Sequence, residues 1–493
     1  MTNLLVTASH NPPQDNGFKT IEPKGEMLPQ SWEKYVTSIA NSVKKNQFDA
    51  FLENFLQVAS EALKNVEIHD RKLKIIVGRD TRESSYRLAS FCKQFFGSIV
   101  NTSQISGNFI DYGVVTTPQL HFIVRKHTLE KQSEKFDLLK EYFNAFFQPF
   151  IDILDKSNHL KFRKLYIDCA NGVGAVQLNQ LKEIFKSKTD KIKIELINTD
   201  YNDFSKLNVD CGADYVKTNQ KLPQGVSPTL AMNPENLFCS LDGDADRIIF
   251  YALDENANFC LLDGDRMATL IGEFFIKKTP KNFWEDIRLG IVQTAYANGN
   301  STSYISEELK LDVKCAKTGV KNLHHDAVEN FDVGIYFEAN GHGTVVFNDL
   351  FTEKLQQENL TELSLFVSLI NQAVGDAITD MFVILAILIN LDIDAKTWFS
   401  KYTDLPNRLV KCVVPDRTQF ETYDFERQLS KPVGLQDSIN QIVSAHNSSN
   451  KTRSFVRASG TEDVVRIYAE AGSMESVDAV IAEVLKAIEN ATV

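Results

Sequence analysis

The stretch KLYIDCANGVG, residues 164–174, joins an apolar run to a loop that contains two glycines. The same succession recurs in LKIIVGRD (73–80), DIRLGIVQTA (286–295) and FDVGIYFEANGHG (331–343), with helical patterns between them. Apolar blocks of this length, alternating with amphipathic helices, are typical of parallel strands buried on both faces of a sheet. The sequence therefore predicts an α/β fold with three consecutive α/β domains, each built on a mixed sheet.

The last hundred residues have a different pattern. Strand-like runs occur at RLVKCVVPD (408–416), TRSFVRASG (452–460) and VVRIYAE (464–470), and an amphipathic helix is predicted over 476–491. This pattern predicts a smaller C-terminal α+β domain. Polar or helical connectors near residues 155, 260 and 390 separate the predicted domains, which are 1–155, 156–260, 261–390 and 391–493.

The composition limits the class of protein. With 493 residues the chain exceeds the ~250–300 residues of a single core, so several domains are expected. The net charge of −12 repels phosphate polymers, which argues against a general nucleic-acid or anionic-membrane surface. The most apolar run, 381–391, is shorter than the ~20 residues that cross a bilayer and is predicted to be a buried helix. Seven cysteines without a Cys-x-x-Cys pair, and no secretory leader, predict reduced thiols and a cytoplasmic location.

The first polar motif, TASHNPP (7–13), directly follows the apolar run LLV. Small residues and prolines around Ser9 would expose its hydroxyl on a rigid loop, beside His10 and ahead of Lys19. A serine hydroxyl is a poor nucleophile unless a base or a metal lies nearby. The motif therefore indicates either a phosphoryl acceptor or an ordinary turn.

The second motif, LDGDADR (241–247), places Asp242, Asp244 and Asp246 at alternate positions. In an extended loop these carboxylates would point to one side and would repel one another without a cation. Oxygen-only ligands favour Mg²⁺, whereas an EF-hand is excluded because Arg247 and Leu253 fall at its sixth and twelfth positions. The alternative is a solvated acidic turn.

The third motif, FEANGHGT (337–344), provides Glu338, Asn340 and His342 around Gly341, at the end of a predicted strand. These groups can bind sugar hydroxyls and an acetamido group, or they can form a structural glycine turn. The fourth motif, RASGTE (457–462), is followed by Arg466.

Two guanidinium groups, two hydroxyls and glycine-loop amides in the fourth motif predict an anion site, with a surface salt-bridge cluster as the alternative. Its candidate residues are Arg457, Ser459, Gly460, Thr461 and Arg466. A dinucleotide fingerprint fails in the loop at 171–174, because its third glycine falls on Gln177, and no P-loop motif is present.

In this order and spacing, TASHNP, LDGDADR, EANGHGT and RASGTEDVVR resemble the α-D-phosphohexomutase superfamily. The loop EANGHGT, together with NGFKTIEPKGEML (16–28) and KTGVKNLHH (317–325), is similar to the branch that acts on N-acetylglucosamine phosphates. The resemblance implies four domains around a central cleft, with one motif supplied by each domain.

The resemblance also implies residue roles. Ser9 would be the phosphoserine, and one Mg²⁺ would be held by a phosphoserine oxygen together with Asp242, Asp244 and Asp246. Lys19 would transfer a proton, Arg247 would neutralise the phosphoserine, and His10 is placed with these catalytic residues. The sugar ligands would be Glu338, Asn340, Gly341 and His342, and the fourth motif would bind the phosphate that is not transferred.

The implied reaction interconverts N-acetylglucosamine 6-phosphate and N-acetylglucosamine 1-phosphate through a 1,6-bisphosphate, in the biosynthesis of UDP-N-acetylglucosamine. The expected partners are sugar phosphates, without nucleic acid or membrane, and the expected assembly is a monomer or weak dimer. Two alternatives remain. One is a magnesium-dependent sugar phosphatase with Asp242 as nucleophile. The other is an inactive binding form, because family members begin with a strand and helix that are expected to be missing here, which leaves an open sheet edge.

Overall fold

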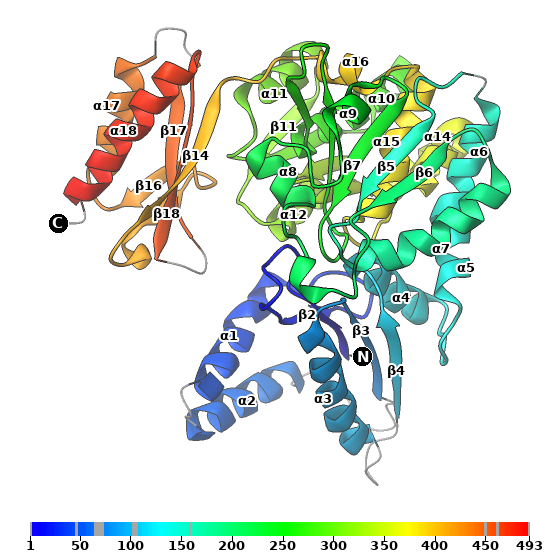
Figure 1. The fold of residues 1–493 in the computed structure, drawn as a ribbon. Coiled ribbons are helices and arrows are strands. Elements are labelled where there is room, and N and C mark those ends of the chain that lie inside the picture. The colour runs from blue at the N-terminus through cyan, green and yellow to red at the C-terminus, as the bar shows by residue number, and fades with distance from the viewer. Residues whose placement is uncertain are drawn as a thin grey trace.

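The computed structural model describes residues 2–44, 48–63, 73–100, 107–157, 159–447, 451–459 and 463–491. These residues form an α/β structure with several mixed sheets and a smaller C-terminal unit, so the predicted fold class is confirmed. Figure 1 shows the first unit (blue) below the second and third sheets, with the C-terminal unit (orange to red) to one side. Among the described residues, no helix is both long enough and apolar enough to cross a membrane.

The first sheet has the order β2-β1-β3-β4. Strand β1 pairs with β2 in antiparallel and with β3 in parallel, and β4 continues the parallel side. The serine loop follows β1, at the carboxyl end of the parallel strands. The elements are β1 (Thr2–Val6), β2 (Phe18–Ile21), α1 (Gln30–Lys44), α2 (Phe48–Leu63), β3 (Leu73–Arg79), α3 (Glu83–Val100), β4 (Gly107–Val114) and α4 (Thr117–Leu129).

The second sheet has the order β6-β5-β7-β8-β9, and the strand β5 comes from the stretch at 164–174. Because β5, β6 and β7 are parallel, the loops after β5 and β7 lie at the same edge. The elements are α5 (Leu138–Tyr142), η1 (Phe143–Phe147), α6 (Gln148–Lys156), β5 (Lys164–Asp168), α7 (Val173–Lys188), β6 (Lys193–Ile197), η2 (Phe204–Lys206), α8 (Ala213–Asn219), α9 (Pro228–Met232), β7 (Asn236–Leu241), β8 (Ile248–Leu253) and β9 (Phe259–Leu262).

The third sheet has the order β11-β10-β12-β13 and shares one continuous hydrophobic core with the second sheet. Helix α15 crosses this core with its residues 377–389 buried, which confirms the buried helix predicted at 381–391. The elements are α10 (Gly264–Lys278), η3 (Lys281–Glu285), β10 (Leu289–Thr294), α11 (Gly299–Ser303), η4 (Tyr304–Glu308), β11 (Asp312–Ala316), α12 (Val320–Asn330), β12 (Val333–Phe337), β13 (Gly343–Phe347), α13 (Asp349–Gln357), α14 (Thr361–Ser368), α15 (Ala377–Leu391) and α16 (Ala395–Phe399).

The C-terminal unit has its own hydrophobic core, between the sheet β14-β18-β17 and two helices. The fourth motif lies at the turn between β17 and β18, and its residues 460–462 lie outside the described residues. The elements are β14 (Asn407–Val413), η5 (Arg417–Gln419), β15 (Glu421–Tyr423), β16 (Gln428–Lys431), α17 (Leu435–Ala445), β17 (Arg453–Ala458), β18 (Val464–Glu470) and α18 (Met474–Ala491).

Candidate active site

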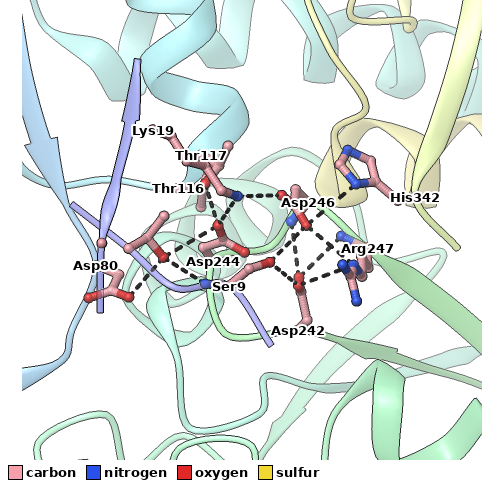
Figure 2. Close-up of polar contacts among 12 residues, drawn as sticks. Ser9, Lys19, Asp80, Thr116, Thr117, Asp242, Asp244, Asp246, Arg247 and His342 are labelled. Atoms are coloured by element: carbon pink, nitrogen blue, oxygen red, sulfur yellow. Dashed lines mark hydrogen bonds and ion pairs between the residues drawn. The ribbon is translucent and has the colours of Figure 1, made fainter. Parts of the chain in front are cut away.

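The serine loop delivers Ser9 into a cluster of carboxylates (Figure 2). Ser9 Oγ donates a hydrogen bond to Asp242 Oδ2 at 3.0 Å and lies 3.4 Å from Asp246 Oδ1. Its backbone has a φ of 53°, in the left-handed region, and its carbonyl oxygen accepts hydrogen bonds from Arg82 and Asn208. Strained backbone of this kind persists only where the surroundings hold it, and it clusters at functional sites.

The aspartate loop brings three carboxylates together by a tight turn. Ligand atoms of Asp242, Asp244 and Asp246 lie within 4.8 Å of one another. The convergence was predicted, but the expected extended loop is wrong: Ala245 has a φ of 57°, and its amide bonds the Asp242 carbonyl at 3.1 Å. A left-handed residue in the turn, rather than the alternation of an extended chain, brings the side chains to one point.

Two glycines let the loops approach closely. A Cβ on Gly243 would lie 2.7 Å from the Ser9 carbonyl oxygen, and a Cβ on Gly172 would lie 2.4 Å from the Gly243 carbonyl oxygen. The loop at 171–174 therefore supports the aspartate loop from behind, which explains why its glycines do not follow a dinucleotide fingerprint. Side chains at either glycine would push the serine and aspartate loops apart.

The carboxylates are buried and unequal. Burial and the charges of Asp246 and Asp244 raise the pKa of Asp242 well above its usual range. Lys19 Nζ lies 2.8 Å from Asp244 and 2.9 Å from Asp246. Burial alone would raise the pKa of Asp246, but the neighbouring Lys19 charge lowers it well below its usual range. Burial alone would lower the pKa of Lys19, but Asp244 and Asp246 outweigh it and raise that pKa.

The aspartate loop fits one magnesium ion. Its donors are carboxylate oxygens, the ligands that Mg²⁺ prefers, and Ser9 Oγ lies beside them. Asp244 Oδ1 is buried and has no hydrogen-bond partner among the described residues, so one oxygen of this carboxylate is left for a cation. A cation would also relieve the repulsion that raises the pKa of Asp242.

Arg247 and His10 lie on one side of the cluster. Arg247 Nε lies 3.9 Å from both Asp242 and Asp246, and its Nη1 donates to Asp214 at 3.1 Å. His10 Nε2 lies 3.7 Å from Asp214. Burial, followed by the Arg247 charge, lowers the pKa of His10, so the ring is neutral at neutral pH.

Several supporting residues escape sequence analysis. Asp80, at the end of β3, accepts a hydrogen bond from Thr7 at 2.9 Å and pairs with the buried Arg82. Thr117, at the start of α4, donates through its hydroxyl and its amide to Asp244. A charged GRDTR run after a strand and a threonine cap before a proline were the available signals. Neither signal identifies the distant partner, which is 73 residues away for Asp80 and 127 residues away for Thr117.

The third motif, 337–344, reaches the same cluster. His342 Nδ1 lies 3.9 Å from Asp246 Oδ1, while the Asn340 side chain bonds the His342 amide at 3.1 Å. Gly341 has a φ of 85°, and a Cβ there would lie 1.9 Å from the Ile248 carbonyl oxygen. Burial alone would lower the pKa of Arg247, but Asp242, Asp214, Asp246 and, more weakly, Glu338 outweigh it and raise that pKa. The turn is therefore structural and also faces the carboxylates.

Helix α15 begins at the aspartate loop. The Ala377 amide approaches the Ala245 carbonyl oxygen at 3.3 Å, and the preceding residue, Asp376, caps the helix. Asp376 also accepts hydrogen bonds from Tyr142 at 2.7 Å and Asn371 at 3.0 Å. A hydrogen bond from the third unit thus stabilises Ala245, the left-handed residue between Asp244 and Asp246.

The arginines of the fourth motif form a separate face. Arg457 and Arg466 are opposite each other in the antiparallel pair β17–β18, so their side chains share one side of the sheet. Ser459 is buried at the end of β17, whereas Gly460 and Thr461 lie outside the described residues. Two guanidinium groups side by side are consistent with an anion site. Among the described residues, Arg457 contacts Glu426 of the C-terminal unit and Tyr296 of the third unit.

Protein-family models match most of the chain. Residues 131–249 and 263–393 match phosphoacetylglucosamine mutase AMG1, domains II and III. Residues 2–47 and 41–132 match the phosphoglucomutase/phosphomannomutase alpha/beta/alpha domain I, and residues 409–487 match its C-terminal domain. Phosphoacetylglucosamine mutase of Saccharomyces cerevisiae is 43% identical over 491 residues, which cover 95% of this chain and 85% of that protein. This chain belongs to the phosphoacetylglucosamine mutase family.

Other members of the family agree. Human phosphoacetylglucosamine mutase is 41% identical over 497 residues, which cover 98% of this chain and 86% of that protein. A crystal structure of N-acetylglucosamine-phosphate mutase in its product complex has a TM-score of 0.87 at 40% identity, covering 98% of this chain and 89% of that one. The Aspergillus fumigatus enzyme in complex with GlcNAc-6P and magnesium has a TM-score of 0.86 at 40% identity, covering 100% and 89%. The predicted relationship to the phosphohexomutases is confirmed.

Proposed function

We propose that this chain interconverts N-acetylglucosamine 6-phosphate and N-acetylglucosamine 1-phosphate through a phosphorylated Ser9. The observation that carries this proposal is the 3.0 Å contact between Ser9 Oγ and Asp242, inside a buried cluster of three carboxylates and one lysine. Phosphoryl transfer depends mainly on positioning and on neutralising charge, and this cluster provides both. Relatives that carry the mutase name and bind GlcNAc-6P with magnesium support the same substrate.

In the first step the phosphoryl group leaves Ser9 Oγ and bonds to the free hydroxyl oxygen of the sugar phosphate, giving a 1,6-bisphosphate. The bisphosphate turns round, and the other phosphoryl group returns to Ser9 Oγ. Magnesium, held by Asp242, Asp244, Asp246 and the phosphoserine, would supply charge neutralisation on the transferring oxygens. The Aspergillus fumigatus mutase has been crystallised as a serine-to-alanine variant in complex with glucose 1,6-bisphosphate, which is consistent with this intermediate.

The protonation states divide the roles of the polar residues. The raised pKa of Lys19 keeps its ammonium charged at neutral pH, so Lys19 serves to neutralise the phosphoryl oxygens. The raised pKa also makes it a weak acid, so it gives its proton only to a strongly basic oxygen such as the Ser9 alkoxide that the transfer leaves behind. His10 is neutral, its Nδ1 is buried without a partner among the described residues, and it can accept the proton of the attacking hydroxyl. Arg247, on the same side of the cluster as His10, lies 3.9 Å from Asp242 and Asp246 and balances the phosphoserine charge.

Recognition of the substrate is assigned to the two other motifs. Glu338, Asn340, Gly341 and His342 would bind the sugar and its acetamido group. The phosphate that stays on the sugar would be bound by Arg457, Ser459, Gly460, Thr461 and Arg466. The proposal extends to a cytoplasmic monomer or weak dimer that feeds UDP-N-acetylglucosamine biosynthesis and has no nucleic-acid partner.

A phosphatase with Asp242 as nucleophile is disfavoured by the contacts of that residue. Asp242 Oδ1 accepts hydrogen bonds from the amides of Asp246 and Arg247, and Oδ2 accepts the Ser9 hydroxyl. Burial also raises the pKa of Asp242, which weakens it as a nucleophile. Its carboxylate is thus committed to the turn and to the serine.

The decisive experiment is to locate the phosphate. After incubation with a sugar 1,6-bisphosphate, intact mass spectrometry and peptide mapping should find one phosphate, on Ser9. Ser9→Ala should lose more than about 1,000-fold in kcat while it still binds N-acetylglucosamine 6-phosphate in calorimetry. Ser187→Ala, at an exposed serine on α7, is the matched control. Wild-type turnover by Ser9→Ala, or a phosphate on another residue, contradicts the proposal.

A further inference from the structure

Two consecutive backbone amides of the third unit each bind a carboxylate, one from the sugar loop and one from the C-terminal unit. The Gly319 amide donates to Glu338 Oε1 of the sugar loop at 3.0 Å. The Thr318 amide donates to Glu426 Oε2 at 2.8 Å, and Glu426 lies in the turn between β15 and β16 of the C-terminal unit. The loop at Thr318 and Gly319 therefore binds one carboxylate of the third unit and one of the C-terminal unit.

The second oxygen of Glu426 engages the phosphate motif. Arg457 Nε donates to Glu426 Oε1 at 2.8 Å, and the two side chains are only 18% and 13% exposed. Burial lowers the pKa of Arg457, but the Glu426 charge outweighs this and raises it. An ion pair this sheltered is weakly screened by salt, so it can fix the direction of the guanidinium.

The backbone at Glu426 is strained. Asp424, Phe425 and Glu426 have φ values of 50°, 56° and 69°, so three consecutive residues with side chains adopt the left-handed region. In this region Cβ lies too close to the following carbonyl oxygen, so the conformation is unfavourable for each of these residues. The strain coincides with the residue whose carboxylate joins Thr318 of the third unit to Arg457 of its own unit. Backbone strain of this kind is found where the conformation serves a function.

We propose that Glu426 is a positioning residue that fixes the phosphate-binding arginine relative to the sugar-binding loop. The inference rests on the proposed function. Glu426 engages Nε, the edge of the Arg457 guanidinium nearest the backbone, which leaves the Nη fork as the part that meets a phosphate. The same carboxylate reaches the amide next to the one that holds Glu338. Glu426 thus sets the spacing between the groups that bind the two ends of one sugar phosphate.

Two substitutions separate the contacts of Glu426. Glu426→Gln keeps a carbonyl oxygen for the Thr318 amide but removes the negative charge that pairs with Arg457. Glu426→Ala removes both contacts. Glu426→Gln should raise KM for N-acetylglucosamine 6-phosphate about tenfold, with kcat within about threefold, and Glu426→Ala should raise KM further. Glu421→Gln is the control, since Glu421 lies in the same hairpin and pairs with Lys431 at 2.8 Å in an exposed position.

Two further measurements keep the inference independent of turnover. Inorganic phosphate, titrated by calorimetry, should bind about tenfold more weakly to Glu426→Gln than to wild type. Combined with Arg457→Lys, Glu426→Gln should add little further loss, because both act through one guanidinium. If Glu426 had a merely structural role, its substitution would instead lower both thermal stability and kcat, rather than raise KM with kcat nearly unchanged.

Unchanged or tighter phosphate binding by Glu426→Gln, or additive losses in the double variant, overturns the role of Glu426 while leaving the proposed function intact. A wild-type chain that binds phosphate in this Glu426-dependent way but does not convert N-acetylglucosamine 6-phosphate would contradict the proposed function alone.

Discussion

The reaction centre and the arginine face of the C-terminal unit are built in different ways. At the centre, Ser9, Lys19 and the three aspartates come from two units, are largely buried and have several partners each (Figure 2). The C-terminal unit has a core of its own and meets the third unit through a limited set of polar and aromatic contacts.

Because of this difference, the two regions should respond differently to substitution. A centre in which every charge has a close, buried neighbour cannot lose one group without affecting the others. An arginine face carried on a separately folded unit can change its fit to a ligand while that unit stays intact. Substitutions at the centre should therefore change kcat and metal binding, and substitutions at the face should change KM.

The largest effect is expected for Asp244→Asn. Asp244 pairs with Lys19 at 2.8 Å, accepts from Thr117 and has one buried oxygen without a partner among the described residues. Losing its charge should lower kcat about 1,000-fold or more and abolish magnesium binding in calorimetry. Glu255→Gln, at an exposed carboxylate just after β8, should leave both unchanged. If Asp244→Asn still binds magnesium normally, the expectation that substitutions at the reaction centre change metal binding is wrong.

A smaller and different effect is expected for Arg466→Lys. Lysine keeps the charge but loses the planar fork that binds phosphate in two places. KM for N-acetylglucosamine 6-phosphate should rise about tenfold, with kcat within about threefold. Arg408→Lys is the control, because Arg408 lies on β14 of the same sheet and pairs with Asp478 in an exposed position. A fall in kcat that matches the rise in KM would place Arg466 in the reaction centre instead.

The same contrast shows how far the sequence could be interpreted. Serine, aspartate and glycine motifs stand directly beside apolar runs, so their position at strand ends was predictable from local pattern, as for Asp242 after β7. Strands β5, β10 and β12 also appear where the apolar runs predicted them.

Local pattern cannot supply partners that only the fold brings together. Thr117 lies 127 residues from Asp244, so nothing in the sequence near either residue indicates their contact. The raised pKa of Lys19 depends on carboxylates 225 and 227 residues away, and this shift favours a protonated role that the sequence left open. Glu426 lies in a hairpin with other charges, and only its contacts with Thr318 and Arg457 distinguish it.

The smallest predicted effect concerns pH, and it should again separate the two regions. His121 on α4 is 3% exposed, its Nδ1 donates to the Gly25 carbonyl at 2.7 Å, and burial lowers its pKa to about 4. In the unfolded chain a histidine titrates near pH 6.5, so the unfolded state binds more protons between these values. The stabilising contribution of neutral His121 is therefore complete above about pH 6.5 and is lost as the pH falls towards 4.

By about pH 5.5 this loss should reach about 1 kcal/mol. Hydrogen exchange, corrected for the intrinsic effect of pH, measures it locally: protection of the α4 amides should fall between about pH 7.5 and pH 5.5 more than protection of α18. His121→Asn keeps a donor for the Gly25 carbonyl without the titration, so its α4 protection should depend less on pH. Equal pH dependence in α4 and α18, or in wild type and His121→Asn, would show that the buried centre does not respond to acid separately from the C-terminal unit.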